Sequence, residues 1–365
     1  SETSVSERDV QANITVLSGD IGTLSHTADN SYHVVIGANN IVIDGFIITG
    51  GCADSMYNWP NNSGGGVLIV SVNMSINNTT IQKNKSLYGG GICCDTSSLS
   101  MSNCVVSENI SVDFGAGICN IFSTGSFTDC IFEKNYVVNY GSGMFNYESN
   151  PTIVNCEFRE NIAMYCGGGM ANSYNASPIL IDCAFRNNTV LSGEGGGIYN
   201  NNRSSPIISN CVFIGNNGSV FGGGMLNNYY SSPTLTNCVL CENSASRGGG
   251  IYNVSSSPML MNCTFSGNAA NQGSGIYNFN KSSSRLTNCI LWNDSESSGN
   301  EIYNVGDLSY GSTAIVTHCD IRDGISGIHN DPQSSVTDNG GNIDLDPLFI
   351  NAPDFSRMTC LDGSS

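Results

Sequence analysis

A short glycine-rich motif returns about every 26 residues through most of this chain. In its fullest form it runs Gly-Gly-Gly-Ile-Tyr-Asn, then Ser-Ser-Pro-x-Leu-x-Asn-Cys-x-Phe-x-x-Asn. The glycine before the Ile or Met recurs at steps of 25 to 28 residues: Gly66, Gly91, Gly117, Gly143, Gly169, Gly197, Gly224, Gly250 and Gly275. Degenerate copies follow at Glu301 and Gly327. A fixed period of this length indicates a solenoid, in which each repeat forms one coil that buries its apolar face against its neighbours.

The residue content of a repeat identifies the type of coil. Apolar residues occur in short alternating runs such as Ile207-Ile208 and Val212-Phe213, and Gly, Asn, Ser and Pro separate these runs. This pattern is typical of short strands and turns, and no helical periodicity is present. We therefore expect an all-β, right-handed parallel β-helix with three strands per coil, about 26 residues per coil and eleven or more coils. A single domain spans residues 1–365: irregular coils over 1–63, regular coils over 64–330 and an end segment over 331–365.

Equivalent positions of neighbouring coils should stack into columns along the rod. The Phe of Phe-x-x-Asn gives one apolar column: Val106, Phe132, Phe158, Phe185, Phe213, Leu240, Phe265, Leu291 and Ile321. The Asn after Gly-Ile-Tyr gives a second column: Asn120, Asn146, Asn172, Asn200, Asn227, Asn253, Asn278, Asn304 and Asn330. The Asn that closes Phe-x-x-Asn gives a third, from Asn109 and Asn135 to Asn268 and Asn293. Stacked amides can hydrogen-bond along the axis, so a structural role is favoured over sugar binding.

Cysteine is frequent, with 16 residues. Nine occupy the Asn-Cys position of successive repeats: Cys104, Cys130, Cys156, Cys183, Cys211, Cys238, Cys263, Cys289 and Cys319. Stacked strands place such residues within disulfide range, yet an odd column cannot pair completely, and buried thiols also pack well. We expect mostly reduced thiols there and predict one disulfide, between Cys93 and Cys119, which lie one coil apart. No spacing of Cys and His is typical of a zinc site.

The charge balance restricts the partners of this chain. The net charge is −18, only 12% of residues are charged, and no basic stripe exists that could bind nucleic acid. No apolar run is long enough to span a membrane. Several Asn-x-Ser/Thr sequences are candidate glycosylation sites: Asn13, Asn73, Asn109, Asn187 and Asn217. With the many cysteines and few lysines, these sites favour an extracellular or cell-surface location.

Four further segments carry a family resemblance: Arg8 to Gly22, Asn30 to Val35, Ile43 to Gly51 and Gly341 to Phe349. Together with the Gly-Gly-Gly-Ile-Tyr-Asn and Asn-Cys-x-Phe-x-x-Asn repeats, they resemble the secreted right-handed β-helix repeat proteins of bacteria and archaea, which have a pectin-lyase-like fold. The repeats are also similar to motifs of chlamydial polymorphic outer-membrane proteins, although the triple glycine differs. The resemblance implies a secreted β-helix. It further implies a leader and more coils ahead of residue 1, so that this chain would be a fragment or processed form.

Enzymatic chemistry has little support in the motifs. The Gly-His-Gly and Arg-Ile-Lys segments of polygalacturonases do not occur, and Lys and Arg total only 12. The aligned column of Glu133, Arg159 and Arg186, with Lys134 beside Glu160, predicts charge pairing between coils. No catalytic or cofactor-binding residue is predicted. Calcium is the one cofactor that the sequence suggests, with candidate carboxylates Asp338, Asp344 and Asp346 in the acidic end segment.

These observations favour an extracellular structural or adhesive surface protein that is not an enzyme. Its expected partners are other copies of itself, assembled head to tail or laterally into a fibre or layer, and cell-surface glycans. Self-association is expected because the terminal strands, such as Val34-Val35-Ile36, are as apolar as interior ones. The alternatives are a polysaccharide lyase or glycosidase, with a site near Cys52 to Asn62 or in the acidic end, and a non-catalytic glycan-binding β-helix.

Overall fold

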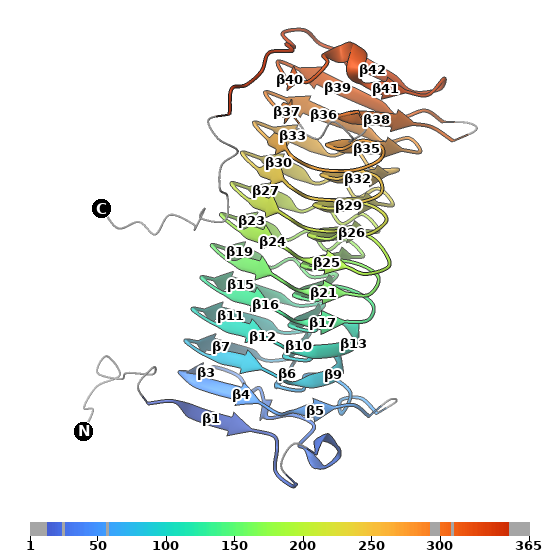
Figure 1. The fold of residues 1–365 in the computed structure, drawn as a ribbon. Helices are drawn as coiled ribbons and strands as arrows, with labels where there is room; N and C mark the ends of the chain where they lie inside the picture. The colour runs from blue at the N-terminus through green and yellow to red at the C-terminus, as the bar shows by residue number, and fades with distance from the viewer. Residues whose placement is uncertain (1–12, 24–25, 56–57, 293–299, 308–309, 350–365) are drawn as a thin grey trace, which may run out of the picture.

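The computed structural model describes residues 13–23, 26–55, 58–292, 300–307 and 310–349, which form a parallel β-solenoid (Figure 1). Three sheets of twelve parallel strands run the length of the rod, and a shorter fourth sheet has six. We name them sheets A to D. The described residues contain two short 3₁₀ turns, η2 (Thr27–Asp29) and η3 (Ile325–Gly327).

Sheet A contains the Phe-x-x-Asn strands. They are β1 (Thr15–Ser18), β4 (Phe46–Thr49), β8 (Thr80–Gln82), β12 (Val105–Ser107), β16 (Ile131–Glu133), β20 (Glu157–Arg159), β24 (Ala184–Arg186), β28 (Val212–Ile214), β31 (Val239–Cys241), β34 (Thr264–Ser266), β37 (Ile290–Trp292) and β40 (Asp320–Ile321).

Sheet B contains the Gly-Ile-Tyr-Asn strands. They are β2 (Val35–Ile36), β6 (Val67–Val70), β10 (Ile92–Asp95), β14 (Ile118–Ile121), β18 (Met144–Tyr147), β22 (Met170–Ser173), β26 (Ile198–Asn201), β29 (Met225–Asn228), β32 (Ile251–Val254), β35 (Ile276–Phe279), β38 (Ile302–Val305) and β41 (His329–Asn330).

Sheet C contains the strands that precede each Asn-Cys pair. They are β3 (Ile41–Asp44), β7 (Asn73–Asn77), β11 (Ser98–Ser102), β15 (Thr124–Thr128), β19 (Thr152–Val154), β23 (Ile179–Ile181), β27 (Ile207–Ser209), β30 (Thr234–Thr236), β33 (Met259–Met261), β36 (Ser283–Thr287), β39 (Thr313–Thr317) and β42 (Ser335–Asp338).

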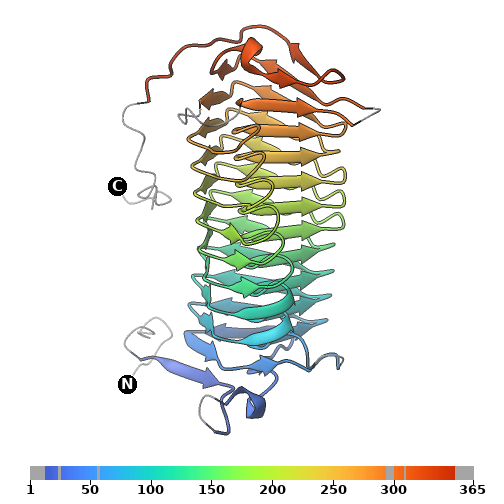
Figure 2. The same cartoon turned by 45° about the vertical axis from the view of Figure 1, so that its right-hand side comes forward.

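Sheet D is a fourth strand position that the predicted three-strand coil omits. Its strands are β5 (Cys52–Ala53), β9 (Lys85–Tyr88), β13 (Ile110–Phe114), β17 (Tyr136–Val137), β21 (Ile162–Ala163) and β25 (Thr189–Val190). Four of the six strands have only two residues, which is too short for an alternating pattern to show in the sequence. A regular coil therefore passes through sheets B, C, A and, in six coils, D before it returns to B (Figure 2).

The apolar interior is a set of columns, as the repeat predicts. The nine residues of the Phe column, from Val106 to Ile321, are all fully buried. Their rings stack face to face: the ring centroids of Phe158 and Phe185 are 4.8 Å apart, and those of Phe185 and Phe213 are 4.9 Å apart. Burial of each such side chain contributes roughly 1.5–3 kcal/mol, so this column is a continuous source of stability.

Two buried asparagine ladders flank the apolar columns, and both were predicted. In the ladder from Asn84 to Asn268, each amide Nδ2 donates to the Oδ1 of the next coil at 2.9–3.1 Å. In the ladder from Asn120 to Asn330, the same bonds measure 2.8–2.9 Å. Asn293, placed in the first ladder by sequence, lies outside the described residues. Because buried polar groups need partners, these ladders hold every coil in register.

The triple glycine of the motif has a steric origin at two of its positions. Gly141 has a φ of 69°, in the left-handed region that suits glycine. Gly143 lies so close to the next coil that a Cβ would stand 2.5 Å from the carbonyl oxygen of Gly169. The motif therefore allows a left-handed turn and then close backbone stacking at the entry to sheet B.

Candidate interaction surfaces

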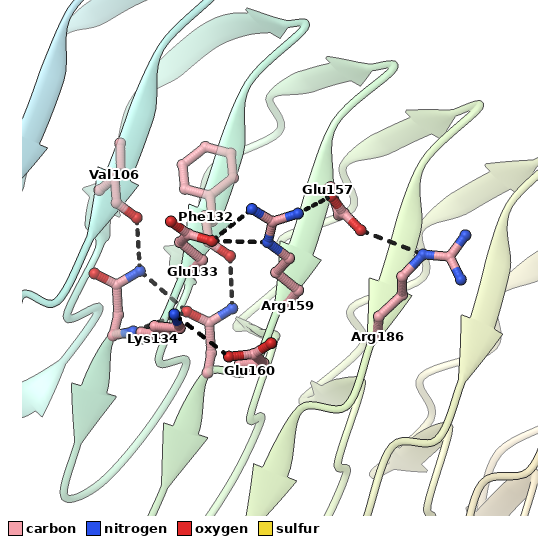
Figure 3. A network of polar contacts seen from close by, with 10 residues as sticks. Val106, Phe132, Glu133, Lys134, Glu157, Arg159, Glu160 and Arg186 are labelled. Atoms are coloured by element: carbon pink, nitrogen blue, oxygen red, sulfur yellow. Dashed lines mark hydrogen bonds and ion pairs between the residues drawn. The ribbon is translucent and has the colours of Figure 1, made fainter. Parts of the chain in front are cut away.

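A network of ion pairs lies on the outer face of sheet A (Figure 3). The Arg159 guanidinium contacts Glu133 at 2.7 Å and Glu157 at 3.0 Å. The Nε of Arg186 contacts the other oxygen of Glu157 at 3.2 Å. Lys134 and Glu160 form a separate, more exposed pair at 3.8 Å. The predicted column of Glu133, Arg159 and Arg186 is confirmed, and Glu157, which joins the two arginines, was missed.

This network is organised for pairing between coils. Arg159 separates Glu133 from Glu157, and both carboxylates accept bonds from guanidinium groups. A glycosidase needs a pair of carboxyl groups that are free to contact the substrate, and here guanidinium groups contact both. The arrangement thus links three coils on the outside of the rod, and it offers little for acid–base chemistry.

The nine cysteines of the Asn-Cys column are buried free thiols. Each Sγ bonds the backbone carbonyl two residues earlier, at 3.2–3.4 Å, as Cys156 does with Val154. Cys93 and Cys119 pair in register on β10 and β14, as the repeat predicts. Both are free thiols in this structure, so the disulfide between them stays a prediction, which non-reducing peptide mapping would test.

We expect the column thiols to be inert in the folded protein. A hydrogen bond to the preceding column thiol, together with burial, raises the pKa of Cys263 and of Cys289 to about 12, so the reactive thiolate is scarce there at neutral pH. Hydrogen bonds between thiols lower the pKa of Cys130, Cys183 and Cys238, so their inertness rests on burial, which closes all nine thiols to a reagent. Iodoacetamide should leave all nine unmodified in the native protein. After unfolding in guanidinium without a reductant, mass spectrometry should find them alkylated. Fast alkylation of these thiols in the native protein, or their failure to be alkylated after unfolding, would contradict this expectation.

The glycosylation candidates divide by exposure. Asn13, Asn73, Asn187 and Asn217 are exposed. Asn109 is fully buried, and its Nδ2 donates to the Ile81 carbonyl at 2.9 Å and to Asn135 Oδ1 at 3.1 Å. Its candidacy was wrong, because the same residue belongs to an asparagine ladder and a glycan on it would break that ladder.

The acidic end segment does not gather its carboxylates. Asp338 accepts bonds from the Gly340 N–H at 2.7 Å and from Asn342 Nδ2 at 2.6 Å. Asp344 accepts from the Asp323 N–H at 3.1 Å, and Asp346 from the Leu348 N–H at 2.9 Å. Within the described part of the chain, no three His, Cys, Asp or Glu residues lie together as metal ligands. Asp338 and Asp346 therefore serve separate local turns, and Asp344 joins the end segment to the turn at Asp323.

The irregular stretch considered as an enzyme site, Cys52 to Asn62, is described except for residues 56 and 57. Cys52 lies buried in β5, and burial, the neighbouring charge of Asp54 and a hydrogen bond to it raise the Cys52 pKa to about 11. The Asn62 carbonyl accepts the Leu87 N–H at 3.0 Å. This segment thus anchors to sheet D, and its thiol is poorly suited to act as a nucleophile.

A second apolar cluster covers the outer face of sheet B. It contains the tyrosines of the Gly-Ile-Tyr-Asn motif, which form a column in which Tyr199, Tyr252 and Tyr277 are buried and Tyr303 is half-buried. The rings of Tyr252 and Tyr277 stack at 4.9 Å. The cover is a row of residues that precede the glycine motif, joined from coil to coil: Tyr88, Phe114, Tyr140, Cys166, Glu194, Phe221, Arg247 and Gln272. The tyrosine column is therefore packed, and most of its surface is closed to a ligand.

Glu194 is a carboxyl group within that apolar cover. Its neighbours include Cys166, Tyr140 and Tyr199, and Arg247 lies two coils further along the row. Burial raises the pKa of the Glu194 carboxyl above its ordinary value of 4.5, because desolvation disfavours the charged form.

The raised pKa of Glu194 predicts that one substitution increases thermal stability in a pH-dependent way. A carboxyl whose pKa is raised by folding stabilises the protein fully below its unfolded pKa, and that contribution is lost as the pH rises through the folded value. Glu194→Gln removes the cost of burying the charge. It should raise the thermal unfolding midpoint at pH 7 by a few degrees and make no difference near pH 4. The matched change at exposed Glu148 should have no effect at either pH. An equal effect of Glu194→Gln at both pH values would contradict the assignment.

An exposed aromatic ridge follows the turns between sheets B and C. We define it as Phe122, Tyr147, Tyr174, Tyr229 and Tyr230. Its four turn residues are 48–66% exposed and have φ values of 46–64°, in the left-handed region. Ring centroids lie 5.5 Å apart for Phe122 and Tyr147 and 5.0 Å apart for Tyr147 and Tyr174. This surface was not predicted, because the residues at the turn positions vary between repeats.

The left-handed backbone conformation at these turns is unfavourable for aromatic residues. Asn202 and Asn280 occupy equivalent left-handed positions in other coils, where asparagine is tolerated well. A bulky residue there costs of order 1–3 kcal/mol. Exposed rings gain little from burial in return. The ridge is therefore a candidate binding surface.

A shallow groove of about 480 Å³ lies at the N-terminal end of sheet A. Its lining is formed by Ile14, Thr15, Gly45, Phe46, Ile47, Asn78, Thr79, Thr80 and Asn103. The lining combines the apolar side chains of Ile14, Phe46 and Ile47 with hydroxyl and amide groups, which suits a neutral ligand.

The fold is a parallel β-solenoid, and the repeated residues of the sequence form its interior. The family model for the right-handed β-helix region matches residues 91–258 and 175–342, which together cover more than half of the chain. The chain belongs to this right-handed β-helix family. Comparisons with curated proteins and with solved structures found no match. In the described residues, no helix is long and apolar enough to cross a membrane.

Proposed function

We propose that this chain is an extracellular structural or adhesive surface protein, a rigid rod that self-associates into a fibre or layer. The observation that carries the proposal is the use of the repeated motif. Its Phe and Cys positions are buried from Cys104 to Ile321, and its two Asn ladders bond from coil to coil along the axis, from Asn84 to Asn330. The motif thus specifies a long, stiff stack, and interaction with partners is left to the outer faces.

The composition supports a location outside the cell. The net charge of −18 and the low share of charged residues give a polar surface of Ser, Thr and Asn. Four candidate glycosylation sites are accessible on it. The resemblance to secreted repeat proteins of bacteria and archaea agrees with this location.

End-to-end contact is one route of assembly that we propose. The strands β1, β2 and β3 stand at one end of the stack, with Val16, Ile36 and Val42 exposed by 51%, 70% and 61%. A strand edge with exposed apolar side chains can pair with another chain. Joining of two copies through these edges would continue the stack and bury these residues.

Light scattering over a wide range of concentration tests the proposal. The mean mass in solution should rise above that of one chain as the concentration increases. The same preparation should release neither unsaturated product nor reducing ends from uronate polymers. A constant monomer mass together with turnover of a polysaccharide would favour the enzyme alternative and refute the structural role.

A non-catalytic glycan-binding function is a second candidate, favoured by the aromatic ridge. Exposed tyrosine rings present an apolar face and a hydroxyl, which suits stacking on a sugar ring. Binding on a glycan array should be lost when Tyr174, Tyr229 and Tyr230 are replaced by serine. Tyr165, which is 49% exposed on another part of the rod, provides the control, and its serine variant should bind normally. Equal binding by both variants would exclude the ridge.

A further inference from the structure

The outer face of sheet C is depleted of charge. The ten strands from β7 to β39 contain no Asp or Glu, although the chain has 30 acidic residues, and Arg285 is their one charged residue. By contrast, the strands of sheet A contain Glu133, Glu157 and Asp320. Two copies of a chain with a net charge of −18 repel one another at most orientations. Along the strands of sheet C they can approach without opposing carboxylates, because the exposed Asp129, Glu148 and Asp182 lie in the turns at its two edges.

The apolar residues of this face lie at its centre. Ile179 and Ile207 pair in register on β23 and β27, the middle two of the ten strands, and are 39% and 52% exposed. In the same row, Thr234 follows Ile207, and Met259 follows Thr234 with 47% exposure. Towards one end, the outward residues are hydroxyl-bearing: Ser98, Ser100 and Ser126. An apolar centre with a polar rim is the usual composition of a protein–protein interface.

The size of the face agrees with a stable contact. Ten strands at ~4.8 Å spacing make a strip about 45–50 Å long. Three to five residues per strand, with the flanking turns, make it roughly 15–20 Å wide. The area is on the order of 800 Å², which is what each partner contributes to an interface of standard size.

We propose that the outer face of sheet C binds a second copy of this chain, sheet against sheet, about a two-fold axis near Ile179 and Ile207. This inference rests on the proposed self-association and assigns its lateral interface. A two-fold axis places the same patch on both partners, and here it sets the central aliphatic residues of one copy against those of the other. Sheets that pack face to face in this way exclude water from their inner side chains.

Sedimentation velocity of the whole chain tests this interface. The wild-type protein should form dimers, and the double variant Ile179→Asp and Ile207→Asp should dissociate at least roughly 30-fold more readily, the loss expected at the centre of an interface. Ile162 in β21 is an exposed isoleucine on sheet D, with 38% exposure against 39% for Ile179. Ile162→Asp is therefore a matched control, and it should dimerise like the wild type. Thermal unfolding of each variant checks that the monomer stays folded.

Cross-linking provides a positive readout that does not depend on lost binding. Ile207→Cys places an accessible thiol near the proposed axis, and mild oxidation should join two chains through it, whereas Ile162→Cys should stay monomeric. A wild type that dimerises while neither the double variant nor the cross-link responds would refute this face and leave self-association standing. A wild type that is monomeric at all concentrations would refute both. A monomeric wild type whose glycan binding is lost in the double variant would show that the face takes another partner, and it would overturn this proposal.

Discussion

Replacement of Asn161 by alanine is expected to lower the free energy of unfolding by about 3–5 kcal/mol, since it leaves several buried polar groups without partners. Asn161 Nδ2 donates to the Phe132 carbonyl at 2.8 Å and to Asn188 Oδ1 at 3.0 Å. Its Oδ1 accepts the backbone N–H of Asn135 at 3.1 Å and the Asn135 amide at 3.0 Å. Figure 3 draws the bonds from this ladder to the carbonyls of Val106 and Phe132. Denaturant titration followed by circular dichroism would measure the loss.

A matched asparagine shows whether the effect belongs to the ladder. Asn271 is exposed and has an ordinary backbone conformation, so Asn271→Ala should change stability by less than about 0.5 kcal/mol. A similar loss of stability in both variants would show that the hydrogen bonds of the ladder do not stabilise the stack of coils.

Replacement of Phe185 by alanine is expected to cost about 3–5 kcal/mol, the range found for removal of a buried aromatic side chain. Its ring lies between those of Phe158 and Phe213, at 4.8 Å and 4.9 Å, and is fully buried. The backbone ladders on both sides limit how far neighbouring coils can close the cavity. The same denaturant titration would record the change as an earlier unfolding midpoint.

Phe122 offers the control for that experiment. It is an exposed phenylalanine at 53%, whose ring contacts Tyr147 at the surface. Phe122→Ala should cost less than about 1 kcal/mol. A comparable loss at both positions would mean that the Phe column does not carry the core.

The interior of this protein could be predicted because stacking turns a period in sequence into neighbours in space. Once the glycine of each repeat was aligned, the Phe, Cys and both Asn columns followed, as did the in-register pairing of Cys93 with Cys119. The column of Glu133, Arg159 and Arg186 followed for the same reason. Asn109 was wrongly chosen because its glycosylation motif was considered without its position in the repeat. That position lies in an asparagine ladder, where the side chain is buried.

The outer surface of the rod was harder to predict, because the side chains that meet there come from loops and turns whose residues vary between repeats. The cover over sheet B depends on residues just before the glycine motif, such as Tyr140 and Glu194, which share no residue type. Glu157 was missed because it lies on a different column from the two arginines it joins. The aromatic ridge and the face of sheet C, whose ten strands from β7 to β39 contain no Asp or Glu, could be recognised only when turns and strand faces were placed in space.

Electron microscopy of the purified chain tests the central claim, that this protein is a rigid rod that assembles through its outer surface. The account predicts rods associated side by side or joined into longer fibres, and loss of the side-by-side contacts in the double variant Ile179→Asp and Ile207→Asp. Dispersed single rods of the wild type at the highest attainable concentration would contradict it.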